Sequence, residues 1–341
     1  MDMKWQRTAG AIVLMAAATG VYAEETITLK LGYWVPPRHG LTAGYKEWGE
    51  ALSKATHGTL KVQLYPSSQL GSGRDHYDMA KRGIADITLV NPGYTPGRFP
   101  VIGTVDLPFT VGDSLKAAPA ITRWYRKYAA KEMSDVITCH AYTHDWATFH
   151  SNKPIRVPAD IKGLNIRTAN QTMSRYVTAM GGNPVQIPIM EAFESLKRGV
   201  TDGISVTLGG LTGPFKFGRV TKYTLDARVY VATFVHVINK AVYERMSPAQ
   251  RKAIDDTCTP EWAGRVYKHW YDQDQRDQVN SRKLTNHVFT KVSPAELKLW
   301  HDAAKPVEKE WAESVRKAGY DPHQVLTELE TELGKVGARV E

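Results

Sequence analysis

The sequence predicts an α/β protein built as two lobes around a cleft. First, strand-like apolar runs alternate with amphipathic helical segments over 27–90 and again over 162–207, which is typical of mostly parallel sheets covered by helices. Second, 341 residues fit two domains, although length alone also permits one large barrel. Third, a helical segment from 260 to about 284 would rise roughly 37 Å, enough to run across two lobes.

The first block starts with a strand, because apolar and polar residues alternate over 27–34 and the run ends at Pro36. A helix follows over 44–56, where apolar side chains recur at helical spacing. The later elements of this block are a strand at 60–65, a helix at 74–82, a strand at 84–90, a helix at 117–133 and a strand at 135–142.

A second block repeats this alternation after a connection near 143–150. Its expected elements are strands at 162–168, 184–187, 203–207 and 229–239, and helices at 171–180, 191–198, 248–257, 260–284, 294–315 and 323–335. We therefore expect an N-terminal lobe at 24–145 plus about 233–272, a C-terminal lobe at 146–232 plus about 273–329, and a C-terminal tail at 330–341.

The first 23 residues are typical of a signal peptide. Lys4 and Arg7 precede an apolar run over 9–18, and small residues lead up to a cleavage site after Ala23. This run is too short to span a bilayer, which takes about 20 apolar residues. We expect a periplasmic protein whose net charge changes from +9 (44 minus 35) to +8 (42 minus 34) on cleavage. Because the basic residues form no dense run, nucleic acid is not an expected partner.

Two cysteines, Cys139 and Cys258, allow one disulfide in an oxidising compartment. The alternative is a pair of separate buried thiols, since free cysteine behaves as a small apolar residue. The sequence leaves both alternatives open.

Enzyme and metal motifs are not found. His140 and His144 have the spacing of a helical metal pair, but they follow a β-branched strand and lack a paired Glu. The glycine-rich run at 70–74 lacks the Lys-Ser/Thr of a phosphate loop. We therefore expect no catalytic residue, no metal and no cofactor.

Arg167 is the strongest candidate for a binding residue. It ends a predicted strand at 162–168, and ligand crevices in open α/β sheets form at the carboxyl ends of strands. A guanidinium group there can hold a carboxylate through two parallel hydrogen bonds. The alternative is a surface arginine in a salt bridge.

Six segments together resemble a known family: Leu-Tyr-Pro-Ser-Ser-Gln-Leu-Gly at 64–71, Arg-Gly-Ile-Ala-Asp-Ile at 82–87, Asp-Leu-Pro-Phe at 106–109, Lys-Gly-Leu-Asn-Ile-Arg at 162–167, Gly-Val-Thr-Asp-Gly at 199–203 and Ile-Asn-Lys at 238–240. Over nearly the whole mature chain, the sequence resembles the DctP-type periplasmic solute-binding proteins of tripartite ATP-independent periplasmic (TRAP) transporters. The resemblance implies a two-lobed periplasmic binding protein fold (type II-like), with a long helix spanning both lobes. It also implies that the protein closes around one small organic anion and hands it to the small and large permease subunits. We expect a monomer.

The resemblance also assigns site residues. Arg167 matches the family's carboxylate-binding arginine, and Asn170 matches a polar position after it. Other positions are expected to line the cleft, with packing inside a lobe as the alternative: Trp34, Asn91, Tyr94, Trp146, Ile189, Val206 and Phe234.

Two departures bear on the ligand. In members that bind sialic acid, the Ala147 position holds a second arginine and the Val206 position an asparagine, and neither is present here. A second carboxylate or a sugar hydroxyl would be left unpaired, at about 1–3 kcal/mol for each unsatisfied group. We expect an apolar or aromatic monocarboxylate.

Two other functions share parts of this pattern. A periplasmic sensor that presents its ligand to a membrane receptor or sensor kinase would have the same fold and pocket, and neighbouring permease genes would separate it from a transport protein. An exported enzyme would need an acid/base pair or a metal site near Arg167, and the sequence shows none.

Overall fold

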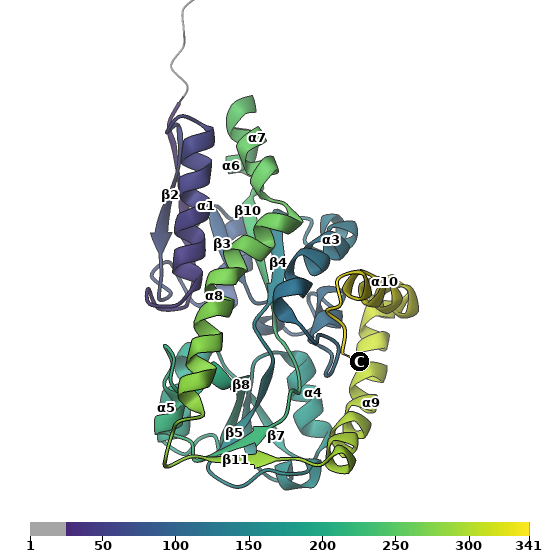
Figure 1. Cartoon of the computed structure of the whole chain (residues 1–341). Helices are drawn as coiled ribbons and strands as arrows, with labels where there is room; N and C mark the ends of the chain where they lie inside the picture. Colours follow the sequence, from purple (N-terminus) through teal and green to yellow (C-terminus); the bar gives the residue numbers. More distant parts are fainter. Residues whose placement is uncertain (1–24, 341) are drawn as a thin grey trace, which may run out of the picture.

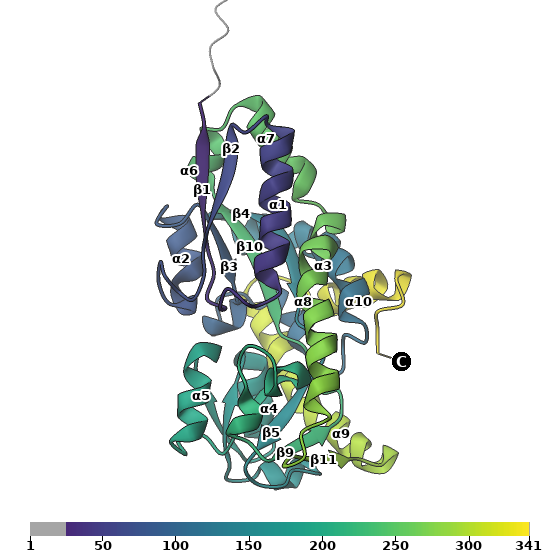
Figure 2. The same ribbon diagram turned by 60° about the vertical axis from the view of Figure 1, so that its left-hand side comes forward.

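The computed structural model describes residues 25–340 and shows two α/β lobes, one above the other along the long axis of the molecule (Figures 1 and 2). Each lobe is built on its own β-sheet. This arrangement confirms the two-lobed α/β fold that the sequence predicts. The predicted signal peptide at 1–23 lies outside the described residues.

The N-terminal lobe contains a five-stranded sheet in the order β2-β1-β3-β10-β4. Strand β1 is parallel to β2 and β3, whereas β10 is antiparallel to β3 and β4. The strands are Ile27–Gly32 (β1), Leu60–Tyr65 (β2), Ile87–Val90 (β3), Val136–Thr143 (β4) and Thr233–Asn239 (β10). The helices are Leu41–Ala55 (α1), His76–Lys81 (α2), Ser114–Glu132 (α3), Lys240–Glu244 (α6) and Pro248–Thr257 (α7).

The C-terminal lobe contains a six-stranded sheet in the order β11-β9-β5-β8-β6-β7. Its strands are Ala147–Ser151 (β5), Asn165–Thr168 (β6), Asn183–Gln186 (β7), Gly203–Thr207 (β8), Tyr223–Asp226 (β9) and Val288–Lys291 (β11). Helices Gln171–Ala179 (α4) and Ile189–Lys197 (α5) follow β6 and β7. The sequence does not predict β5, β9 or β11, which are short strands without a clear alternation of apolar and polar residues.

Helix α8 (Pro260–Ser281) runs along both lobes, as the two views show (Figures 1 and 2). Its 22 residues correspond to about 33 Å. In the N-terminal lobe, α1 approaches α8 so closely that a Cβ on Gly44 would lie 2.3 Å from the Val266 carbonyl oxygen. In the C-terminal lobe, a Cβ on Gly209 would lie 2.1 Å from Asp274 Oδ1. Small residues on both lobes therefore let α8 pack tightly against each.

The C-terminal helices return the chain to the N-terminal lobe. Helix α9 (Pro294–Lys317) packs on α4, and α10 (Pro322–Lys335) packs on α3. The sequence-based boundaries assign 273–329 to the C-terminal lobe and 330–341 to a tail, whereas the structure makes 322–335 one helix of the N-terminal lobe. The reason is an apolar stripe on α10, whose buried members are Val325, Leu329 and Leu333.

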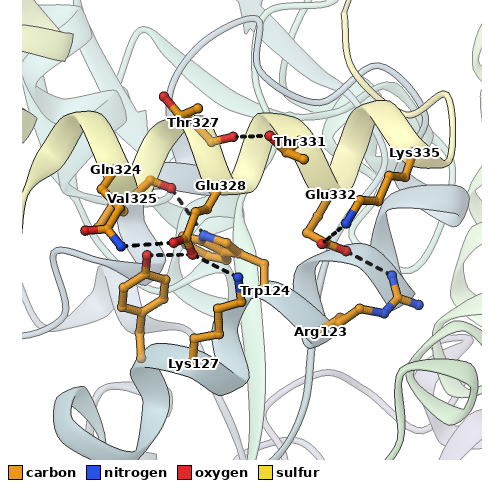
Figure 3. A network of polar contacts seen from close by, with 11 residues as sticks. Arg123, Trp124, Lys127, Gln324, Val325, Thr327, Glu328, Thr331, Glu332 and Lys335 are labelled. Carbon is orange, nitrogen blue, oxygen red and sulfur yellow. Dashed lines mark hydrogen bonds and ion pairs between the residues drawn. The ribbon is translucent and has the colours of Figure 1, made fainter.

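Polar contacts support the packing of α10 on α3 (Figure 3). Lys127 Nζ lies 3.0 Å from a carboxylate oxygen of Glu328, and Arg123 Nη1 lies 3.1 Å from one of Glu332. The Trp124 indole N–H donates to a backbone carbonyl of α10 at 3.2 Å. These contacts attach the last helix to the side of the lobe that carries α3.

A disulfide joins Cys139 on β4 to Cys258 at the end of α7, with the Cα atoms 4.5 Å apart. Both residues are buried in the N-terminal lobe. Beside them, His140 Nε2 lies 2.8 Å from the Thr257 carbonyl oxygen, and His140 Nδ1 lies 3.2 Å from His236 Nδ1. The disulfide thus ties the sheet of this lobe to its covering helix through a fully buried region.

Candidate functional site

The two lobes and α8 line one common cavity. Clefts between two domains are frequent binding sites for small organic ligands. The wall includes seven of the nine predicted binding residues: Trp34, Asn91, Tyr94, Arg167, Ile189, Val206 and Phe234. The structure therefore brings most of the predicted set together around one cavity.

Arg167 lies on β6 and is only 2% exposed. Its Nε donates to the Ile187 carbonyl oxygen at 3.0 Å, and its Nη1 donates to the Ser205 carbonyl oxygen at 3.4 Å. These two bonds fix the plane of the guanidinium group from the neighbouring strand and loop. Within residues 25–340, Arg167 forms no ion pair with a carboxylate. A buried positive charge therefore lines the cavity without an ion-pair partner among the described residues.

Asn170 does not line the cavity. Its Oδ1 accepts a hydrogen bond from the Met173 backbone N–H at 2.8 Å and so caps α4. Its Nδ2 is buried and has no hydrogen-bond partner in the described part of the chain. A Cβ on Gly93 of the opposite lobe would lie 2.2 Å from the Asn170 Cβ. Asn170 thus lies at the contact between the lobes.

An aromatic wall covers the side of the cavity that faces the N-terminal lobe and α8. The ring centroid of Trp34 lies 5.6 Å from that of Tyr94 and 5.9 Å from that of Phe234. Phe234 in turn lies 5.1 Å from Trp270 on α8. All four rings are at least nine-tenths buried, so the wall presents a continuous apolar surface to a ligand.

Trp146 is the second predicted residue that does not reach this cavity. It lines two other surface depressions, and the Arg228 guanidinium carbon lies 5.5 Å from the centroid of its ring. A bend at Asp145, whose Oδ1 accepts the Trp146 backbone N–H at 2.8 Å, breaks the alternation of the crossover segment. As a result, His144 rather than Trp146 lines the cavity.

The sequence did not single out several further residues of the wall: Val35, His39, Leu41, Leu89, Ala169, Ser205, Thr207, Gly209, Gly210, Pro214, Phe215, Tyr230, Ala232, Trp270, Gln273, Asp274 and Asp277. Many of them follow the ends of strands, which was the only sequence signal for them. The Tyr230 hydroxyl is buried and has no hydrogen-bond partner among the described residues. Burial dominates and raises the pKa of Tyr230 well above its usual range, so the phenol stays protonated.

His144 also stays neutral at physiological pH. Burial, together with the charge of Arg167, lowers its pKa to about 4. Its Nδ1 lies 2.5 Å from the Asp145 carbonyl oxygen and therefore carries the ring proton. The cavity thus holds one permanent cation, Arg167, beside a neutral imidazole.

Two carboxyl groups line the cavity from α8. Burial, together with the nearby Asp145, raises the pKa of Asp274 to about 7. Thr207 Oγ1 donates to Asp274 at 3.0 Å. Burial also raises the pKa of Asp277, whose side chain makes no hydrogen bond or ion pair with the residues that the structure describes. A second anion in the cavity would meet these two groups.

Comparison with known proteins identifies the family. Residues 31–314 match the family model described as bacterial extracellular solute-binding protein, family 7 (DctP). The chain belongs to this family. Its members are solute-binding proteins, so the resemblance inferred from the sequence motifs is confirmed.

Among solved structures, a TRAP solute-binding protein from Rhodoferax ferrireducens T118 in complex with copurified benzoate is 28% identical, with a TM-score of 0.85 over 92% of this chain and 99% of that one. One from Bordetella bronchiseptica with bound (R)- and (S)-mandelate is 25% identical, with a TM-score of 0.83 over 91% and 99%. The 2,3-diketo-L-gulonate-binding periplasmic protein YiaO of Escherichia coli K12 is 26% identical over 79% of this chain and 82% of its own length. The homologues are periplasmic solute-binding proteins.

In this solute-binding protein, the lobes contact each other directly around the cavity. The Ile189 backbone N–H donates to Tyr94 Oη at 3.1 Å, and Arg74 Nη2 donates to the Gln186 carbonyl oxygen at 2.6 Å. Gln186 Nε2 donates to the Gly93 carbonyl oxygen. These bonds between lobes describe a cleft closed around its cavity.

No group of three or more potential metal ligands occurs among residues 25–340. His140 lies in the core of the N-terminal lobe, whereas His144 lies in the cavity wall. The two histidines therefore do not form a metal pair. Within the same part of the chain, no helix is long and apolar enough to cross a membrane.

Proposed function

We propose that this TRAP solute-binding protein captures an apolar or aromatic monocarboxylate between its lobes and delivers it to the small and large membrane subunits of the permease. The observation that carries this proposal is the buried Arg167 guanidinium, which has no carboxylate partner among the described residues. Leaving such a charge unpaired in a low-dielectric site is costly, so an entering carboxylate is strongly favoured. Two parallel hydrogen bonds from a guanidinium group suit a carboxylate in particular.

The wall around Arg167 favours one carboxylate and an apolar body. Trp34, Phe234 and Trp270 offer ring surfaces, and burying apolar ligand area stabilises the complex by roughly 25 cal/mol per Å². A second carboxylate would meet Asp274 and Asp277 rather than another basic side chain. Succinate or malate would therefore bury a charge without a partner.

The relatives support the same ligand class. The proteins from Rhodoferax ferrireducens and Bordetella bronchiseptica hold benzoate and mandelate, each of which has one carboxylate and one ring. Their similarity covers 99% of the length of each of those chains. Benzoate and mandelate are therefore the first ligands to test.

A thermal-shift screen of organic acids tests the proposal. Benzoate and mandelate are expected to raise the melting temperature, because a ligand at 100 times its dissociation constant adds about 2.7 kcal/mol to the free energy of unfolding. Succinate, malate and sialic acid are expected to leave it unchanged. A clear shift with dicarboxylates alone would overturn the ligand class while leaving the family assignment intact.

Export and delivery need their own test. Cells that carry the full gene are expected to release a monomeric protein from the periplasm whose first residue is Glu24. Uptake of labelled benzoate is expected only when both membrane subunits are present. Ligand binding without uptake, combined with a response of a membrane receptor, would instead favour a sensor.

A further inference from the structure

His39 is a polar residue of the cavity wall that the recognition of a carboxylate does not use. It follows β1 and lies against α8, with its ring centroid 4.8 Å from that of Trp270 and 6.0 Å from that of Phe215. It is only 3% exposed. A buried histidine in a binding cavity therefore has to find hydrogen-bond partners for both ring nitrogens.

The backbone determines which nitrogen of His39 carries the proton. The Leu41 backbone N–H donates to His39 Nδ1 at 3.3 Å, so Nδ1 acts as an acceptor. Burial lowers the pKa of the ring to about 3, and the imidazole is neutral at physiological pH. In a neutral imidazole with an accepting Nδ1, the proton is on Nε2.

This Nε2–H donor belongs to a residue of the cavity wall. It has no hydrogen-bond partner among residues 25–340. It also does not belong to the unpaired polar atoms that are fully buried, so the atom keeps some accessible surface. The small surface that His39 keeps therefore includes Nε2. His144, the other histidine of the wall, has the opposite tautomer, since its Nδ1 donates to a backbone carbonyl oxygen.

His39 lines the cavity from the N-terminal lobe, whereas Arg167 lines it from the C-terminal lobe. Ring contacts run from Tyr94 through Trp34, Phe234 and Trp270 to His39. His39 is thus a polar group beside the aromatic wall on which the body of a ligand would lie.

We propose that His39 Nε2–H donates a hydrogen bond to an oxygen on the body of the ligand, so that the preferred ligands are aromatic monocarboxylates with a ring hydroxyl group. This inference rests on the proposed function and adds a second polar contact to it. A hydroxyl group suits this cavity better than a second carboxylate, because it is uncharged beside Asp274 and Asp277 and can also donate a hydrogen bond.

Calorimetry with benzoate, 3-hydroxybenzoate and 4-hydroxybenzoate tests the role of His39. In the wild-type protein, at least one hydroxybenzoate is expected to bind about two- to tenfold more tightly than benzoate, the range of one neutral hydrogen bond. His39→Asn keeps an acceptor near Nδ1 for the Leu41 N–H but removes the cavity donor, so the three acids are expected to bind equally. His39→Gln places an amide N–H near Nε2 and is expected to keep part of the preference.

The outcomes separate this inference from the proposed function. If His39→Asn keeps the full preference, another donor such as the Trp270 indole makes the contact, and the inference is overturned. If the wild-type protein binds benzoate as tightly as both hydroxybenzoates, the role of His39 is also overturned, but the monocarboxylate assignment stands. If none of the three acids binds, the proposed ligand class is lost and the inference with it.

Discussion

The two lobes make different contributions to the cavity. The N-terminal lobe supplies Trp34, Tyr94 and Phe234, and its core is tied together by the disulfide and by buried histidines. The C-terminal lobe supplies the charged anchor, Arg167, and both cysteines of the chain lie outside it. The apolar surface and the cation that a ligand needs therefore come from opposite sides of the cleft.

This division couples binding to closure. A monocarboxylate that touches only the C-terminal lobe lacks the rings of Trp34, Tyr94 and Phe234, and one that touches only the N-terminal lobe lacks the guanidinium group of Arg167. Ligand binding is thus expected to stabilise the closed arrangement seen here, because a ligand can shift an equilibrium only by its differential affinity for the two states.

The largest effect on stability is expected from removal of the disulfide of the N-terminal lobe. Replacing Cys139 and Cys258 by Ser opens a loop of 118 residues (258 minus 139 minus 1). The loop entropy of the unfolded chain predicts a loss of about 4–5 kcal/mol in the free energy of unfolding. Urea denaturation measures this loss. Ligand affinity at 25 °C is expected to be unchanged, because neither cysteine lines the cavity.

Mass analysis provides the direct check on that pair. The periplasmically expressed wild-type protein is expected to resist thiol alkylation under denaturing, non-reducing conditions, and to take up two alkyl groups after reduction. Two alkylated cysteines before reduction would contradict the disulfide.

The second prediction concerns the charged anchor of the C-terminal lobe. Arg167→Lys keeps the positive charge but loses the planar group that donates two parallel hydrogen bonds, and Arg167→Ala removes both. Each variant is therefore expected to bind the ligand at least tenfold more weakly. Losing one partner of a buried charge pair commonly costs about 2–5 kcal/mol. Calorimetry with the best acid from the thermal-shift screen measures the change. Arg175→Lys on α4 is the matched control, because this arginine pairs with Glu310. Wild-type ligand affinity in Arg167→Lys would rule out two parallel hydrogen bonds from Arg167 to the carboxylate.

The third prediction tests the buried histidines of both lobes by pH. Burial lowers the pKa of His140 to about 4 and of His150 to about 3, whereas the unfolded chain titrates near 6.5. The stability from each neutral ring is present above pH 6.5 and is lost as the pH falls toward those values, at about 1.4 kcal/mol per pH unit for one proton. Burial raises the pKa of Asp106 and of Glu132 to about 7, so their contribution to stability grows as the pH falls. Because this offsets the effect of the histidines in the wild-type protein, each histidine variant is compared with the wild type.

Urea denaturation at pH 6.5, 5.5 and 4.5 makes that comparison. His140→Gln and His150→Gln are each expected to lower the dependence of stability on pH by about one proton. The exposed His323 offers a matched control, and His323→Gln is expected to follow the wild-type curve. Equal pH slopes in all four proteins would show that the rings are not neutral in the folded state.

The smallest effect is expected at the contact between the lobes. Tyr94→Phe keeps the ring beside Trp34 but removes the hydroxyl oxygen that accepts the Ile189 N–H. One neutral hydrogen bond contributes about 0.5–1.5 kcal/mol, so affinity is expected to fall about two- to tenfold. Calorimetry measures the difference, with Tyr243→Phe, a tyrosine that bonds Asp255 far from the cavity, as the control. Undiminished binding would mean that this bond does not help to hold the cleft closed.

Local patterns were sufficient for much of this fold. Helical spacing located α1, α3, α8 and α9 to within a few residues, because each buries one stripe of side chains along its length. Short strands were missed, since four residues of β9 or β11 show no distinguishable period and are stabilised by pairing with a neighbour. The placement of α10 on the N-terminal lobe also needed the structure, because an apolar stripe does not say which surface it packs against.

The α/β class, the family and the position of Arg167 near the end of a strand could be predicted from the sequence, because they depend on local periodicity and on contiguous motifs. The shared wall of His39, Phe215 and Trp270, and the bend at Asp145 that takes Trp146 away from it, could be seen only in the folded protein. A cavity between lobes is made by contacts between segments far apart in the chain. Residue order specifies which face of each segment is apolar, and the packing of the lobes on α8 specifies which of those faces meet.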